Sequence, residues 1–111
     1  TRFAWSSEAP SRLTKLGHRA LQETGPDVLL ADFTACDRFD VMERLREVET
    51  PTLVIAGSVD QLTPVKYARF AAEHIYDARL VVVEGAGHMA MLERPAEVTR
   101  AVQDFLKKPP P

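Results

Sequence analysis

The second half of the chain is organised around short apolar runs that do not alternate with polar residues. One run covers residues 52–56 and another covers residues 80–83. Unbroken apolar runs of this length are typical of parallel strands that are buried on both faces. Apolar residues recur at helical spacing over residues 67–75, and again over residues 98–106 after Pro95. We therefore predict a strand–helix–strand–helix order, with two parallel strands joined by a right-handed crossover.

The first half of the chain predicts helices instead of strands. Helical spacing begins at Ser11, the expected N-cap, and continues to about residue 23. Gly25 marks the end of this helix, and Pro26 is expected at the first position of the next one. Cys36 on that second helix is better explained by packing than by nucleophilic chemistry. Asp40 is expected to cap a short third helix that ends before residue 51.

Two further details concern the ends of predicted elements. Residues 1–10 are predicted to be irregular, and their aromatic residues Phe3 and Trp5 either line a pocket or anchor this end of the chain. Thr63 followed by Pro64 is typical of a helix N-cap with proline in the first turn.

Composition places the chain among small globular domains. Of its 111 residues, 45% are hydrophobic and 27% are charged. The net charge of −2 comes without a basic block, so no nucleic-acid partner is expected. No apolar run approaches the roughly 18 residues of a membrane span, so we expect no membrane association. Cys36 has no second cysteine to pair with and fits a reducing compartment, so a cytoplasmic location is expected.

Neither a metal nor a cofactor is expected. Three scattered histidines and one cysteine do not provide the ligands of a metal site. The sequence from Gly85 to Gly87 leads to His88 and not to a third glycine at a helix N-terminus, so it is no phosphate-binding loop.

Asp60 and His88 are the residues that suggest chemistry. The strands are expected to end at about Ala56 and Glu84, and Asp60 and His88 each follow one of these ends by four residues. Parallel strands bring both loops to the same edge of the sheet. An aspartate beside a histidine fixes the imidazole tautomer and stabilises its protonated form, as in Ser-His-Asp systems. A plainer alternative is that Asp60 only caps its own turn.

The loops around these two residues resemble those of the α/β-hydrolase superfamily. Residues 57–64, Gly-Ser-Val-Asp-Gln-Leu-Thr-Pro, look like its acid loop, and residues 85–88 with Glu-Arg-Pro at 93–95 look like its histidine loop and last helix. The resemblance implies the C-terminal portion of an α/β-hydrolase fold over residues 48–111. Residues 1–47 would then be the end of a helical cap region and its return to the core. Asp60 would be the triad acid and His88 the triad base.

The chain departs from that family in one respect. It has no Gly-x-Ser-x-Gly elbow, and its serines are at positions 6, 7, 11 and 58. Ser58 lies two residues before Asp60 in the acid's own loop, so we do not expect it to be a nucleophile. The chain is therefore expected to supply two of three triad members, and by itself to be nearly inactive.

The resemblance implies that the longer parent enzyme hydrolyses carboxylic esters or related acyl bonds of a small-molecule substrate. Variants of the family use an aspartate nucleophile, cleave carbon–carbon bonds or open lactones, and the motifs do not choose among these reactions. Three apolar residues flank the acid and the base and could form a wall for that substrate, although core packing explains them equally well: Leu62, Met89 and Met91.

A second function class stays open, namely a non-catalytic α/β module. Only two strands are predicted, both apolar throughout, so an isolated copy would expose strand edges that can pair with another chain. We expect self-association, or a complementary N-terminal chain that completes the sheet.

Overall fold

The computed structural model describes residues 2–107. Its helices and strands, in chain order, are η1 (Arg2–Ala4), α1 (Ser11–Thr24), α2 (Pro26–Arg38), η2 (Met42–Glu47), β1 (Thr52–Gly57), α3 (Val65–His74), β2 (Ala78–Val83), α4 (Ala90–Glu93) and α5 (Pro95–Lys107).

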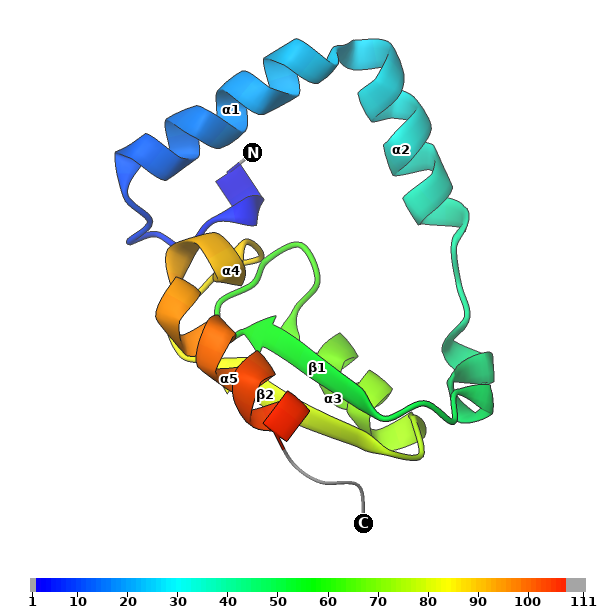
Figure 1. Ribbon diagram of the computed structural model, residues 1–111. Helices are drawn as coiled ribbons and strands as arrows, with labels where there is room; N and C mark the ends of the chain where they lie inside the picture. The colour runs from blue at the N-terminus through cyan, green and yellow to red at the C-terminus, as the bar shows by residue number, and fades with distance from the viewer. Residues whose placement is uncertain (1, 108–111) are drawn as a thin grey trace.

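A two-stranded parallel sheet forms the centre of the second half. Strand β1 pairs with β2 in a register that runs from Thr52 opposite Ala78 to Gly57 opposite Val83. Helix α3 is the crossover between the strands, and it lies behind the sheet in Figure 1 while α5 lies in front of it. The predicted parallel sheet with flanking helices is confirmed, and both strands end at the same edge.

Several boundaries differ from the sequence prediction. Strand β2 begins at Ala78, two residues earlier than expected, because Ala78 pairs with Thr52. Helix α3 begins at Val65 with Pro64 at its N-cap, so the prediction that Thr63 caps this helix is wrong. The short helix α4 was not predicted from the sequence.

Helices α1 and α2 form an arc that stands away from the sheet (Figure 1). Gly25, at a φ of 87°, ends α1, and Pro26 begins α2, as predicted. Ser11 is the first helical residue and not the N-cap, a position that Pro10 occupies without a side-chain hydrogen bond. The third helix is of the 3-10 type and its N-cap is Val41, so the prediction that Asp40 occupies this position is wrong. Oδ1 of Asp40 nevertheless accepts the N–H of the first helical residue, Met42, at 3.0 Å.

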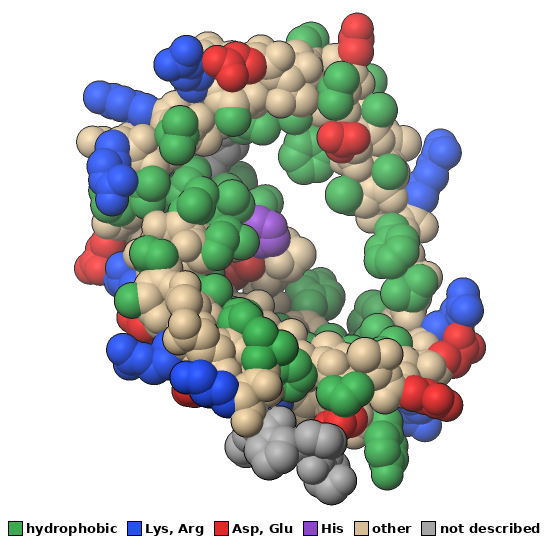
Figure 2. Space-filling view, viewed as in Figure 1, with side chains coloured by type: hydrophobic (Ala, Val, Ile, Leu, Met, Phe, Trp, Pro, Cys, Tyr) green, Lys and Arg blue, Asp and Glu red, His purple; other side chains and the backbone are tan. Residues whose placement is uncertain are grey.

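The packed position expected for Cys36 is wrong within residues 2–107. Cys36 is exposed, α2 has no buried residue, and Phe33 on the same helix is 64% exposed. Figure 2 shows hydrophobic side chains along the inner side of the arc, facing a hollow. The apolar pattern of α2 is therefore real, but the described residues provide nothing for it to pack against.

The core lies directly beneath the loops at the carboxyl end of the sheet. Val83, Ala86 and Ala90 are buried together, with Ile55 and Val98 packed against them. The predicted burial of α5 is only partly confirmed: Val98, Ala101 and Phe105 are half-buried, whereas Val102 and Leu106 are exposed.

The N-terminal residues are more ordered than predicted. Residues 2–4 form the short helix η1, and Trp5 is buried while Phe3 is exposed. Trp5 thus anchors this end of the chain. Over residues 2–107 no helix has the length and apolar content needed to cross a bilayer.

Candidate active site

Two loops meet at the carboxyl edge of the sheet because β1 ends in a glycine. The N–H groups of Ser58 and Val59 donate to the carbonyls of Val83 and Ala86, each at 3.0 Å. A Cβ atom on Gly57 would lie 2.2 Å from the Ala86 oxygen, closer than real atoms approach. Only glycine at this position allows the acid loop and the histidine loop to lie side by side.

The turn after β2 is closed by Gly85 and Ser58. Gly85 has a φ of 78°, a left-handed conformation that favours glycine, and its N–H donates to Ser58 Oγ at 2.8 Å. Ser58 therefore holds the histidine turn against the acid loop.

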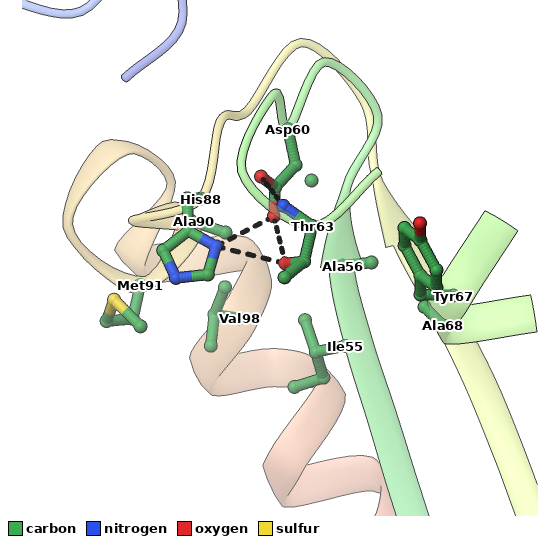
Figure 3. A pocket seen from close by; sticks show the side chains of 11 residues that line it. Ile55, Ala56, Asp60, Thr63, Tyr67, Ala68, His88, Ala90, Met91 and Val98 are labelled. Atoms are coloured by element: carbon green, nitrogen blue, oxygen red, sulfur yellow. Dashed lines mark hydrogen bonds and ion pairs between the residues drawn. The ribbon is translucent and has the colours of Figure 1, made fainter. Parts of the chain in front are cut away.

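Asp60 and His88 are in direct contact. Nδ1 of His88 lies 2.9 Å from Oδ2 of Asp60 (Figure 3). The other carboxylate oxygen, Oδ1, accepts the N–H groups of Leu62 at 2.9 Å and Thr63 at 3.0 Å. Asp60 thus caps its own turn and also binds the imidazole, so the interpretation that it only caps its turn is wrong.

The surroundings of Asp60 keep its carboxylate ionised. Its side chain is only 6% exposed, whereas that of His88 is 39% exposed. Burial taken alone raises the pKa of Asp60. Hydrogen bonds from the Thr63 N–H, the His88 ring, the Leu62 N–H and the Thr63 hydroxyl outweigh burial and leave the pKa below its ordinary value. Because the carboxylate can only accept, Nδ1 of His88 must carry the proton, which leaves the lone pair on Nε2.

Thr63 is a site residue that the sequence reasoning missed. Its hydroxyl lies 3.1 Å from Asp60 Oδ2 and 3.2 Å from His88 Nδ1, so it touches both members of the pair (Figure 3). The proline that follows it favours a helix cap at this threonine. Its position three residues after Asp60 is the signal that could have revealed this role, since an aspartate that caps a turn reaches that residue.

A pocket of about 360 Å³ opens beside the pair. Its lining includes Asp60, Thr63, His88, Met91 and Tyr67. Figure 3 shows the His88 ring with Nδ1 towards Asp60 and its other nitrogen on the opposite side.

The three apolar residues expected to contact substrate are placed differently from one another. Met91 lines the pocket and is exposed, Leu62 is exposed but is not part of the lining, and Met89 is half-buried outside it. Within residues 2–107, no three His, Cys, Asp or Glu side chains come close enough together to hold a metal ion.

Comparison with known proteins shows which family the chain belongs to. Residues 26–110 match the family described as TAP-like protein. The chain is 37% identical over 89 residues to a proposed carbamate hydrolase, RutD, of Pseudomonas savastanoi pv. phaseolicola, covering 80% of this chain and 34% of that protein. It is 32% identical over 101 residues to 3-oxoadipate enol-lactonase 2 of Acinetobacter baylyi, covering 91% of this chain and 37% of that one.

A solved structure of a thermophilic esterase superposes with a TM-score of 0.82 at 41% identity, over 96% of this chain and 42% of that chain. The chain belongs to the α/β-hydrolase superfamily, and its parallel sheet with flanking helices is part of that fold. These relatives are hydrolases by description, and the chain spans 34% to 42% of their length.

Proposed function

We propose that this chain is the C-terminal part of a serine-type α/β-hydrolase that cleaves carboxylic esters or related acyl bonds. The observation that carries the proposal is the 2.9 Å contact between His88 Nδ1 and Asp60 Oδ2. It fixes the tautomer in which Nε2 is a base, and His88 lines an open pocket.

The reaction has two halves, acylation and deacylation, and Asp60 and His88 act in both. Nε2 of His88 takes the proton of a serine hydroxyl as the serine oxygen bonds to the acyl carbon, and Asp60 stabilises the resulting imidazolium. The imidazolium then gives that proton to the departing alcohol oxygen, which leaves an acyl-enzyme. Water attacks the acyl carbon with Nε2 again as base, and the carboxylic acid and the free serine are released.

The serine in this proposal belongs to a part of the parent protein outside these 111 residues. Within the described chain, Ser58 Oγ accepts the Gly85 N–H, and Ser6 Oγ is bound to Glu93. Neither serine stands in a Gly-x-Ser-x-Gly elbow. The 111-residue chain alone should therefore show almost no turnover.

The substrate class is supported by the chemistry that the relatives' descriptions share. Carbamates, enol-lactones and esters all contain an acyl carbon bonded to a leaving oxygen or nitrogen, and the same histidine relay serves each of them. Hydrolysis rates of a nitrophenyl ester, a lactone and a carbamate by the parent enzyme would rank these three bonds.

The experiment is an ester assay on the parent enzyme with variants of the pair. We expect His88→Ala and Asp60→Asn each to lower kcat by about 10⁴-fold or more, as losing a member of such a relay does. The matched controls are His18→Ala and Asp77→Asn, both at exposed positions away from the pocket.

A fluorophosphonate probe should label a serine of the parent and leave the 111-residue chain unlabelled. Ester turnover that survives both His88→Ala and Asp60→Asn would contradict the proposal, as would a parent sequence without a nucleophile elbow.

A second candidate is a non-catalytic module that assembles through its uncovered surfaces. It is favoured by the two-stranded sheet and by exposed apolar side chains on or beside α2: Leu30, Phe33 and Phe39. We propose the N-terminal part of the parent as the partner that covers them, with a second copy as the alternative. Light scattering of the 111-residue chain alone should show self-association, and a monodisperse monomer at high concentration would contradict it.

A further inference from the structure

Glu93 is a buried carboxylate with no cationic partner among residues 2–107. It is 8% exposed. Its Oε2 accepts the N–H groups of Ser6 and Gly87, each at 3.1 Å, and its Oε1 accepts the Ser6 hydroxyl. A buried charge is costly unless hydrogen bonds replace its water, and here neutral donors from two distant segments do so.

Hydrogen bonds to Glu93 and to Ala4 hold the main chain on both sides of His88. The residue before it, Gly87, donates its N–H to Glu93, and the residue after it, Met89, donates its N–H to the Ala4 carbonyl at 3.1 Å. Residues 4–6 therefore contact the peptide units that flank the histidine, one directly and one through Glu93.

The packing of residues 4–6 leaves this arrangement little freedom. A Cβ atom on Gly87 would lie 2.6 Å from the Ser6 nitrogen, so the two backbones are in direct contact. Trp5 is buried, and a Cβ atom on Gly17 of α1 would lie 2.8 Å from its ring. The segment is thus fixed between α1 and the histidine loop.

We propose that Glu93 and Ser6 are positioning residues that set the direction of the His88 Nε2 lone pair. The inference rests on the proposed role of His88 as the base. The His88 side chain is 39% exposed, and its polar contacts within the described residues are at Nδ1 alone. The orientation of the ring, and of Nε2, therefore depends on where the backbone places His88. A displacement of about 1 Å at a reacting group can cost about 100-fold in rate.

The test uses the parent enzyme with two changes of different severity. Glu93→Gln replaces one accepting oxygen by an amide that can only donate, so a donor from Ser6 or Gly87 loses its acceptor. Ser6→Ala removes one hydroxyl and keeps the backbone contacts. The matched controls are Glu84→Gln, at an exposed carboxylate beside the same turn, and Ser7→Ala, at the exposed neighbouring serine.

The kinetic readout separates positioning from a purely structural role. Rates are expressed per active site titrated with a fluorophosphonate, so loss of folded enzyme does not count. We expect kcat to fall about 10- to 100-fold in Glu93→Gln and about three- to tenfold in Ser6→Ala, with KM within about twofold. Both controls should keep kcat within about twofold.

Each outcome decides the inference. Variants that lose thermal stability but keep kcat per active site would overturn it, because the contacts would then be structural only. If Glu93→Gln does not fold, Ser6→Ala decides alone by the same criterion. If His88→Ala abolishes turnover while Glu93→Gln and Ser6→Ala keep kcat, the positioning inference fails and the proposed function stands. If His88→Ala stays fully active, the proposed function itself fails, and the positioning inference fails with it.

Discussion

Thr63→Val tests whether the threonine hydroxyl supports the acid–histidine pair. The change removes a group that lies 3.1 Å from Asp60 Oδ2 and 3.2 Å from His88 Nδ1 and puts a methyl group in its place. Because Nδ1–H faces the carboxylate, the hydroxyl donates to Asp60 and offers its lone pair to Nδ1–H. Thr63→Val therefore removes one of the hydrogen bonds that lower the pKa of Asp60, and that pKa rises towards its ordinary value.

The magnitude follows from the geometry of the lost bond. Hydrogen bonds to charged groups contribute about 1.5 to 3 kcal/mol to stability. The distance from the Thr63 hydroxyl oxygen to Asp60 Oδ2 is longer than the roughly 2.7 to 2.8 Å that is common for hydroxyl donors, and Thr63 is exposed. We therefore take the contribution of this hydrogen bond as about 1 kcal/mol. The Thr63 N–H bond to Oδ1 survives the change. An effect of about 1 kcal/mol corresponds to about a fivefold fall in kcat/KM.

The assay is hydrolysis of a nitrophenyl ester by the parent enzyme, with two comparison variants. Thr63→Ser keeps the hydroxyl and should restore most of kcat/KM. Thr99→Val, at an exposed position on α5, makes the same chemical change away from the pocket and should have no effect. Equal activity of Thr63→Val and the unaltered enzyme would refute the reasoning. So would a Thr63→Ser variant as impaired as Thr63→Val, since the methyl group would then matter and not the hydroxyl.

Three further predictions concern the same loops. Gly57→Ala should destabilise the fold by about 3 kcal/mol, measured by urea denaturation, and should lower kcat/KM about 100-fold. Gly25→Ala is the control: Gly25 has a φ of 87° but no atom within 4 Å of an added Cβ, so this change should lower stability and leave kcat/KM unchanged. Ser58→Ala removes the acceptor of the Gly85 N–H and should cost about 1 kcal/mol of stability, with fluorophosphonate labelling retained. Since the folded-state pKa of Asp60 is lowered, its stabilising contribution should be constant above about pH 4 and lost as pH falls through the folded value, and Asp60→Asn should remove this dependence.

The acid–histidine contact was predictable because it follows from strand geometry. The parallel strands end opposite each other at Gly57 and Val83, and the loops that carry Asp60 and His88 therefore begin at one edge of the sheet. Asp60 and His88 needed no knowledge of the rest of the chain, and their contact distance agrees with that expectation. The glycines of the two loops were also visible in the sequence, although the close approach at Gly57 was not.

Other features could not be predicted because they depend on long-range packing. The apolar stripe of α2 correctly predicts a helix, but it does not say which part of a larger fold would cover Phe33 or Cys36. In the sequence Glu93 belongs to the segment that resembles the histidine loop and last helix, and nothing there indicates a hydrogen bond to Ser6, 87 positions away. Periodicity describes an element and its faces, and it carries no information about a hydrogen bond between distant segments. The division into a cap at residues 1–47 and a core at residues 48–111 stays a prediction.

The contacts of His88 imply that the geometry needed for its proposed role as a base forms without the nucleophile. Asp60 and Thr63 bind Nδ1, and the Glu93 and Ala4 contacts hold the flanking backbone, and all of these groups lie within the described residues. The edge of the ring that carries Nε2 is free of such contacts in the same residues. Preorganised groups do not have to reorient when charge develops in a reaction. Under the proposed function, a serine brought to the pocket by the rest of the parent protein would therefore meet a histidine that is already oriented. Assembly of the parent fold would then need to place the serine without rearranging the histidine.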